Sequence, residues 1–276
     1  MYIVSPFTPL FFNPSTDTSG INSRYIQVFS PSDEIMLQVI TRSESRTITG
    51  KIIDVITGTE TDITWSVWSL NSTDKLYYKV ITDLNDSYYQ IDINGNMSNV
   101  FRVTSDVNEL ADTTLIQYTM KDNKDRQDVV FWISEIQHFF DFRVHGGFKD
   151  EDWSFGVENE QFTDANYNMC EVYSHEKTNK TFTMGNSCGC PVWFAELLNR
   201  ILSCSHVYFN GERYMRLDSS TPEMSILMEG YKGYVFKQAL TATNFVDYSE
   251  TENLLKIRRV GNEDTFRKVS NKLLTV

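Results

Sequence analysis

The sequence predicts a mainly β protein with two antiparallel β-sandwich or barrel-like domains, the second carrying a single amphipathic helix at about 191–203. Three observations predict this class. The apolar runs are rich in β-branched and aromatic residues, with 18 Phe, 14 Tyr and 5 Trp among 276 residues, as is typical of strands. Apolar and polar residues alternate over short segments, which clusters of Ser, Thr, Asn, Asp and Gly separate. Only one stretch repeats its apolar residues with a helical period.

The first domain is expected over residues 1–108. Seven alternating segments follow one another there at short intervals: SRYIQVFS, EIMLQVIT, GKIIDVIT, TDITWSVWSL, KLYYKVIT, YYQIDIN and NVFRVTS. Turn-forming clusters lie between them, for example at residues 30–33 and 94–96. Short strands at this spacing predict a jelly-roll or immunoglobulin-like β-sandwich.

The second domain is expected over residues 109–245, with a basic extension at 246–276. Its predicted strands are DVVFWIS, QHFFDFRV, WSFGVE, NMCEVYS and KTFTMG, with turns at 145–147 and 177–180. The acidic group DED at 150–152 lacks the spaced ligands of a calcium loop, so a solvated loop is expected there. In SHVYFNGERYMRL, Asn210 and Gly211 predict a hairpin with a two-residue type I′ turn.

The stretch MGNSCGCPVWFAELLNRILSC, residues 184–204, predicts a sharp turn followed by the helix. Pro191 suits the first turn of a helix, and the Gly, Asn and Ser residues before it suit the bend. Glu196 and Arg200 form an i,i+4 pair on the polar face. The apolar residues recur at helical spacing and form one broad face: Trp193, Phe194, Leu197, Leu198, Ile201 and Leu202. We therefore expect an amphipathic helix that lies on a sheet.

Three of the four cysteines, Cys188, Cys190 and Cys204, lie in the same stretch and raise chemical alternatives. A structural zinc site usually uses two CxxC-type pairs, whereas this chain has one CxC and no second pair. A disulfide between Cys188 and Cys190 would close a strained ring. A catalytic thiolate needs a neighbouring base, and the four histidines are scattered along the chain. No GxSxG, HExxH, GxGxxG or phosphate-loop motif occurs, so we predict reduced structural thiols, no metal, no cofactor and no enzymatic activity.

Charge and hydropathy limit the partners. The formal net charge of −12 argues against nucleic-acid binding, because phosphate contacts require a basic surface. No apolar run reaches the roughly 18 residues of a membrane-spanning helix, so no membrane insertion is expected. The opening segment MYIVSPFTPLFF has no basic start and is interrupted by Pro6 and Pro9, so we expect no signal peptide and synthesis in a cytoplasm.

The basic residues gather at the C-terminal end. Residues 251–276 carry six Lys or Arg and three Asp or Glu, a net charge of +3, which leaves −15 for the first 250 residues. Such an extension can dock on the acidic surface of a neighbouring copy, and a solvated tail is the alternative. The predicted inter-subunit contacts are Lys256, Arg258, Arg259, Arg267 and Lys268.

Aromatic residues of the first domain raise a second functional hypothesis. Trp65 and Trp68, with the pairs Tyr77-Tyr78 and Tyr88-Tyr89, could form a surface on which a host-surface glycan stacks. Adjacent aromatic residues of a strand point to opposite faces, however, so half of each pair fills the core. A carbohydrate- or receptor-binding module is therefore the alternative function, with Trp65 and Trp68 as its contacts.

The run from about Asn108 to Ala242, roughly half of the chain, resembles a known class of proteins. Four segments resemble tail-module structural proteins of tailed phages and prophages of gut bacteria. They are LIQYTMKDNKDRQDVVFW, FFDFRVHGGFKDEDWSFGVENEQF, FTMGNSCGCPVWFAELLNRIL and VYFNGERYMRL. The order of strands, turn, lone helix and hairpin is similar to the building block of tail-tube, tail-terminator and distal-tail proteins.

This resemblance implies a non-enzymatic virion subunit, present in many copies in a ring at the tail, tail tip or baseplate. Its expected partners are further copies of itself and other phage structural proteins, and it would be assembled in the host cytoplasm. One feature departs from distal-tail proteins, which put the ring-forming domain first, whereas the predicted helix here lies in the second half. The family has no catalytic positions, so the resemblance assigns no functional residue.

Overall fold

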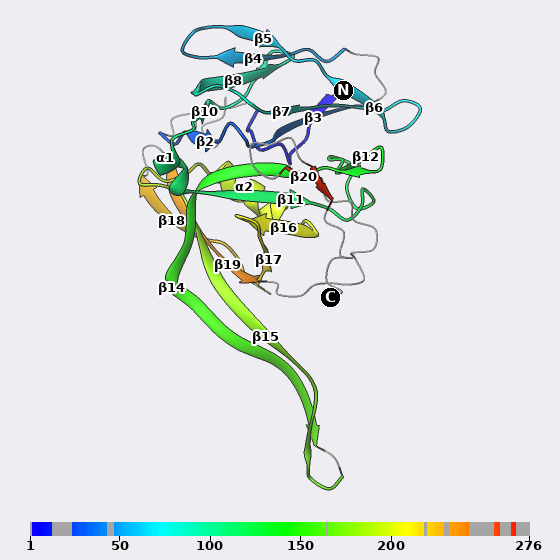
Figure 1. Cartoon of the computed structure of the whole chain (residues 1–276), viewed down its shortest axis with the longest axis vertical. Coiled ribbons are helices and arrows are strands. Elements are labelled where there is room, and N and C mark those ends of the chain that lie inside the picture. The colour runs from blue at the N-terminus through cyan, green and yellow to red at the C-terminus, as the bar shows by residue number, and fades with distance from the viewer. Residues whose placement is uncertain are drawn as a thin grey trace.

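The computed structural model describes most of the chain and carries side chains for all described residues except 150–152, 228, 257–259 and 266–268. The described residues are 2–12, 24–42, 47–163, 165–217, 220–228, 232–242, 257–259 and 266–268. The predicted mainly β class is confirmed, with several antiparallel sheets and two short helices among these residues (Figure 1).

Two sheets formed by the first hundred residues pack face to face. One has the order β1 (Tyr2–Val4), β3 (Ile35–Thr41), β7 (Lys75–Ile81) and β6 (Ser66–Ser69). The other has the order β2 (Gln27–Phe29), β10 (Phe101–Val103), β8 (Ser87–Ile93), β4 (Gly50–Asp54) and β5 (Glu60–Asp62), and β9 (Asn96–Met97) also pairs with β8. The pair β2–β10 is parallel, unlike the antiparallel pairs around it. Alternate apolar residues of β3, β8 and β10 fill the space between the two sheets.

The strand β3 is buried on both faces, so the body of the protein has three layers. All seven of its residues, IMLQVIT, are buried. Leu37 and Val39 belong to the core of the sandwich, whereas Met36 belongs to the core of the second half. Gln38 bonds the backbone of Val130 in both directions, at 2.6 and 3.0 Å, and so satisfies a polar side chain between the layers. The two halves therefore pack against each other, with β3 between their cores.

The second half forms a ring-like sheet. Its strands are β15 (Met169–Met184), β14 (Phe140–Thr163), β11 (Thr113–Thr119), β16 (His206–Phe209), β17 (Glu212–Arg216) and β19 (Gly233–Ala242). Pairing of β19 with β15 closes the ring, and β18 (Glu223–Met228) pairs with β19 outside it. Two further pairs of strands are β12 (Trp132–Ile133) with β13 (Ile136–Gln137) and β20 (Ile257–Arg259) with β21 (Phe266–Lys268).

The predicted amphipathic helix is α2 (Val192–Ile201). Its apolar face, including Trp193, Phe194 and Leu197, is buried in the core that the ring-like sheet encloses. Glu196 and Arg200 lie 3.7 Å apart across one helical turn, as the spacing predicts. The structure adds one helix that the sequence pattern did not indicate, α1 (Val107–Ala111), which begins at the N-cap Asp106 and precedes β11.

The Cys-rich corner, residues 185–190, connects β15 to α2 and is joined to β19 by backbone hydrogen bonds. Pro191 is the N-cap residue, and Cys190 exchanges two backbone hydrogen bonds with Tyr234 of β19, at 2.8 and 3.0 Å. Gly189 has φ of +72°, and a Cβ there would lie 2.5 Å from the backbone nitrogen of Tyr234. Only glycine allows this approach of the corner to β19, and the corner in turn aims the helix at the sheet.

The hairpin between β16 and β17 also agrees with the prediction. Asn210 and Gly211 both have positive φ, at 47° and 90°, as a type I′ turn requires. Phe209 pairs with Glu212 across the two-residue loop.

Three predictions for residues 145–180 are wrong. The expected turns at 145–147 and 177–180, and the expected loop at 150–152, all lie within β14 and β15. The two strands have 24 and 16 residues and leave the body as one long hairpin (Figure 1). Gly146 marks the departure, because β14 pairs with β11 only as far as His145.

Candidate functional site

The most distinctive feature outside the core is a two-stranded arm, defined here as residues 153–180 (Figure 1). Within the described residues, β19 pairs with β15 as far as Thr178–Ala242, and β14 pairs with β11 as far as His145. From Gly156 and Lys177 outward, the strand pairs that the structure describes join β14 and β15 to each other alone. A register shift after Glu160 inserts a bulge, which bends such a ribbon. Among the residues that the structure describes, no strand pairs with the outer edges of the arm and no second layer covers its faces.

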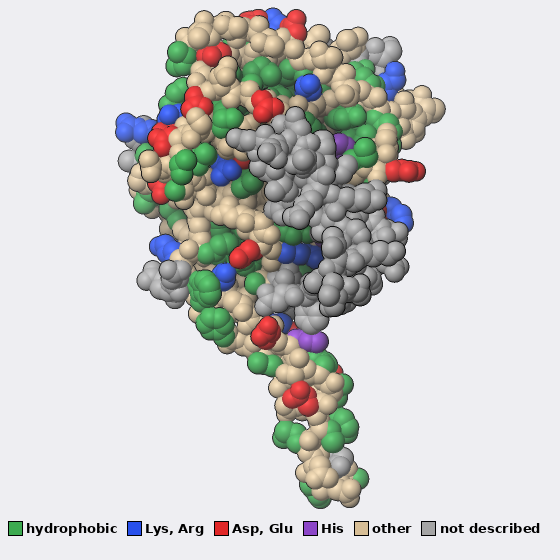
Figure 2. Space-filling view, in the orientation of Figure 1, with side chains coloured by type: hydrophobic (Ala, Val, Ile, Leu, Met, Phe, Trp, Pro, Cys, Tyr) green, Lys and Arg blue, Asp and Glu red, His purple; other side chains and the backbone are tan. Residues whose placement is uncertain are grey.

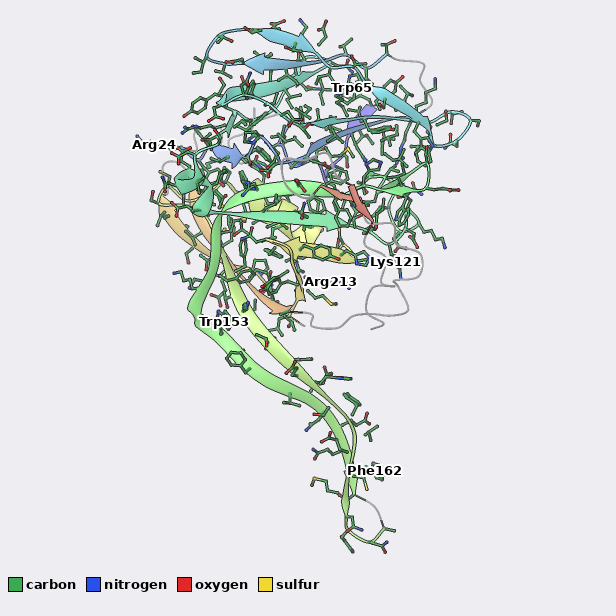
Figure 3. All side chains as sticks on the ribbon, in the orientation of Figure 1. Arg24, Trp65, Lys121, Trp153, Phe162 and Arg213 are labelled. Atoms are coloured by element: carbon green, nitrogen blue, oxygen red, sulfur yellow. The ribbon has the colours of Figure 1, made fainter. Side chains whose placement is uncertain are left out.

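Large apolar side chains are exposed along this arm (Figure 2). Trp153, Phe155 and Val157 alternate along β14 and so lie on one face, where Phe155 is 74 % exposed. Toward the far end, the exposed apolar residues are Phe162, Tyr167, Met169 and Val172. Trp153 lies near the body and Phe162 near the far end (Figure 3). Such a concentration of exposed apolar surface is typical of an interaction site.

A pocket of about 390 Å³ lies where the arm meets the body, and we call it the base pocket. Its lining comes from four strands: Trp153, Phe155, Thr178, Lys180, Glu212, Arg213 and Ala242. The Trp153 and Phe155 rings lie 6.1 Å apart with an interplanar angle of 58°, and they form its apolar wall. Apart from Ala242, the remaining lining residues are polar or charged.

Lys180 organises the polar side of the base pocket. Its side chain is 13 % exposed, and its Nζ lies 4.1 Å from the centroid of the Trp153 ring. The ammonium donates a 2.8 Å hydrogen bond to the Tyr214 hydroxyl, which donates to Glu212 Oε2 at 2.8 Å. Burial and the Glu212 carboxylate raise the pKa of Tyr214, so its hydroxyl stays protonated. These two hydrogen bonds hold the Lys180 ammonium next to the Trp153 ring.

The described residues 165–168 at the far end of the arm include Tyr167. This side chain is 90 % exposed, and its backbone has φ of +64°. A bulky residue rarely adopts this left-handed conformation, which Gly or Asn adopts at lower cost. The position thus carries a conformational cost while its ring is left in solvent.

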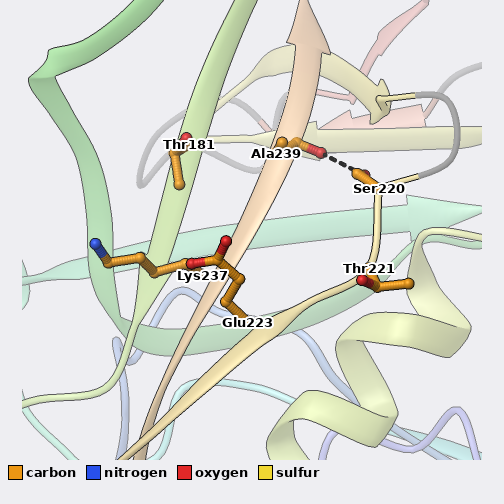
Figure 4. Close-up of a pocket in the computed structure, with 6 residues that line it drawn as sticks. All are labelled: Thr181, Ser220, Thr221, Glu223, Lys237 and Ala239. Carbon is orange, nitrogen blue, oxygen red and sulfur yellow. Dashed lines mark hydrogen bonds between the residues drawn. The ribbon is translucent and has the colours of Figure 1, made fainter.

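A second pocket, of about 430 Å³, lies over β15, β19 and the approach to β18 (Figure 4). It is lined by Thr181, Ser220, Thr221, Glu223, Lys237 and Ala239. Ser220 donates a 3.3 Å hydrogen bond to the Ala239 carbonyl, and Glu223 and Lys237 are register partners across β18 and β19. Its polar lining resembles an ordinary solvated sheet face.

The four cysteines do not come together. Cys190 is completely buried in the core, and burial raises its pKa far above the usual range of a thiol. Burial likewise raises the pKa of Cys204 to about 12. Cys188 lies at the partly buried corner, and Cys170 belongs to the arm. Within the described residues, no three His, Cys, Asp or Glu side chains are placed so that they could hold a metal ion.

The residues predicted for glycan contact lie apart. Trp65 is partly buried and packs against the core of the sandwich, close to Gly50. Trp68 is also partly buried but packs against a different cluster, with Val130 and Ile133. The two indoles therefore do not share one binding face.

The side chains of all five basic residues predicted for inter-subunit contact lie outside the described side chains. Lys256 falls outside the described residues. Arg258 and Arg259 lie on β20, and Arg267 and Lys268 lie on β21, with Arg258 opposite Arg267. Their role stays a prediction.

The sequence pattern indicates neither the arm nor the base pocket. The alternation Trp153, Phe155, Val157 was visible as a strand, WSFGVE, but not as part of a strand without a covering layer. The pocket joins residues from 153 to 242, so it depends on the register of four strands.

Neither helix of the described part has the length and hydropathy that crossing a bilayer requires. Comparison with known proteins gives no relative: no protein-family model, no curated protein and no solved structure matches this chain.

Proposed function

We propose that the protein is a non-enzymatic structural subunit that assembles in many copies, as in a ring of a phage tail or tail tip. The observation that carries this proposal is the arm, a long hairpin with apolar side chains exposed on its surface. A monomer gains nothing from holding Phe155, Val157 and Phe162 in water, because covering apolar surface stabilises by about 25 cal/mol per Å². A neighbouring subunit would supply that cover.

Two further features support assembly. Within the described part of the chain, both edges of the arm are open, and unpaired strand edges add strands from other chains readily. The resemblance of residues 108–242 to tail-module proteins points to the same class of function, with other phage structural proteins as partners and the virion tail as location.

The test removes the arm and keeps the body. Phe155 and Thr178 are directly opposite in the ladder, so replacing Gly156–Lys177 with Asn-Gly closes a two-residue hairpin there. We expect the full-length protein to form a defined oligomer in light scattering and electron microscopy, and the shortened variant to be a monomer that still unfolds cooperatively. A full-length protein that stays monomeric at every concentration, and is missing from purified virions, would contradict the proposal.

A further inference from the structure

We propose that the base pocket of one copy receives the Tyr167 side chain at the far end of a second copy's arm. This inference rests on the proposed function and adds to it the two surfaces that meet. The first support is Tyr167 itself, a bulky residue held at φ of +64° with 90 % of its side chain exposed. The isolated fold bears the cost of this conformation without burying the ring, as expected of a residue kept for a contact with another molecule.

The base pocket has the chemistry that a tyrosine side chain requires. Its volume of about 390 Å³ accommodates one aromatic side chain, and Trp153 and Phe155 provide a ring wall against which another ring can pack. Lys180 and Glu212 line the pocket beside these rings, and the Glu212 carboxylate, which is 70 % exposed, can accept a further hydrogen bond. An amphipathic aromatic group therefore finds both an apolar wall and a polar partner, as in protein interfaces in which one aromatic anchor enters one pocket.

Charge also favours this pairing. Residues 161–173, which include the turn, carry Asp164 and Glu171 and no Lys or Arg. The pocket contributes Lys180 and Arg213 against one carboxylate, Glu212. An acidic arm end and a basic pocket attract one another and disfavour the approach of two pockets or two arm ends.

The occupant comes from another molecule. Trp153 and Phe162 are nine residues apart on one strand, which corresponds to about 30 Å at the usual rise of a strand. A hairpin of this length cannot bring Tyr167 back to its own base. Because the two contacting surfaces differ, the contact can be exchanged reciprocally in a two-fold dimer or repeated head-to-tail in a closed ring or an open filament, and the proposed ring requires the head-to-tail form.

The test uses complementation between two full-length variants. Tyr167→Ala removes the side chain and leaves the pocket, whereas Phe155→Asp places a carboxylate in the pocket and leaves Tyr167. Each variant alone is expected to associate at least ten-fold more weakly than wild type in analytical ultracentrifugation. An equimolar mixture is expected to form a dimer and nothing larger, since only one intact pocket can meet one intact tyrosine. Ile56→Asp adds the same charge to an exposed apolar site in the β4–β5 turn and should assemble as wild type does.

The outcomes separate this inference from the proposed function. If wild type does not associate, the proposed function fails. If wild type and Tyr167→Ala associate equally, or if the mixture stays monomeric while both variants are folded by circular dichroism, only the pocket assignment fails. A further check asks whether the base pocket is empty in the monomeric Tyr167→Ala variant. Acrylamide quenching of its tryptophan fluorescence is compared with that of the same variant carrying Trp153→Phe, and the difference reports the exposure of Trp153. Trp153 is 42 % exposed in the single chain, so partial quenching is expected. Complete protection would mean that the chain fills its own pocket, which overturns the inference.

Discussion

Arg143 of β14 holds Asp33 of the first sandwich through two parallel hydrogen bonds. Its Nε donates to Oδ2 at 2.6 Å and its Nη2 donates to Oδ1 at 2.8 Å. The two side chains are 13 % and 2 % exposed, so the pair is sheltered from solvent. Arg143 also donates to Thr113 Oγ1 at 3.0 Å. One guanidinium thus joins the turn before β3 to the ring-like sheet.

Removing this guanidinium is expected to destabilise the whole body. Arg143→Met keeps much of the side-chain volume but leaves the buried Asp33 carboxylate without its charged partner, at a cost of about 3–5 kcal/mol. The matched control is Arg102→Met, which removes the half-buried pair Arg102–Glu109 and should cost less than about 1 kcal/mol. Urea unfolding of both variants measures the difference. Equal losses of stability would show that the Arg143 pair is no stronger than a surface pair.

Asp141, two residues before Arg143, makes stability depend on pH. Burial, with the nearby Asp33 and Glu34 charges, raises its pKa to about 7, although the Glu34 N–H and the Gln117 amide both donate to it. A carboxyl with a raised pKa in the folded state stabilises the fold fully at pH values below its unfolded pKa, near 4, and this contribution is lost as the pH rises toward 7. The loss is on the order of 4 kcal/mol.

The variant Asp141→Asn isolates that contribution. It should flatten the decline of the free energy of unfolding between pH 4 and 7 relative to wild type, as measured by urea titrations across this range. His138 and His145 have pKa values lowered by burial, so they change stability in the opposite direction and remain in both proteins. Parallel pH profiles for wild type and Asp141→Asn would refute a raised pKa at Asp141.

The departure of the arm depends on Gly146. A Cβ at this position would lie 2.1 Å from the Thr183 carbonyl oxygen, and φ is +133°. Gly146→Ala should therefore cost more than about 3 kcal/mol, or prevent pairing of β14 with β15 at this point. The neighbouring Gly147→Ala is the control, because a Cβ there meets only Thr114 Oγ1, at 4.0 Å. Thermal unfolding distinguishes them, and a tolerated Gly146→Ala would mean that the strands can separate without cost.

Much of the fold could be predicted because short-range signals for strands, turns and the helix specify the same buried faces that the structure shows. The alternating segments of the first half, the Asn210-Gly211 turn and the helix after Pro191 each follow from a short-range signal. The helix is the clearest case, since one apolar face and one glycine-containing corner specify both its start and its orientation.

The arm could not be predicted for an equally physical reason. Strands are usually about five or six residues long, and their signal is a buried face that alternates with a solvated one. The alternation in residues 153–158 indicates a short strand, but acidic residues at 150–152 precede it, and no described residue covers either face of the outer ribbon. Gly146 and Gly147 have the composition of a turn, although Gly146 serves a close approach to Thr183. A surface that contacts a partner leaves only a weak pattern in the sequence, because the residues that cover it belong to another molecule.

The thiols of the Cys-rich corner provide a test of its structural role. Cys190 is completely buried and its pKa is raised by burial, and burial raises that of Cys204 to about 12, so neither offers a thiolate near neutral pH. At pH 8 we expect Cys170 and Cys188 to react quickly with iodoacetamide, Cys204 slowly, and Cys190 only at the rate of unfolding. Peptide mass spectrometry after timed labelling identifies each site, and protein in urea, where all four should react, is the control. Rapid labelling of Cys190 in folded protein would instead indicate an accessible, activated thiol, which is incompatible with a corner that only turns the chain from β15 into α2.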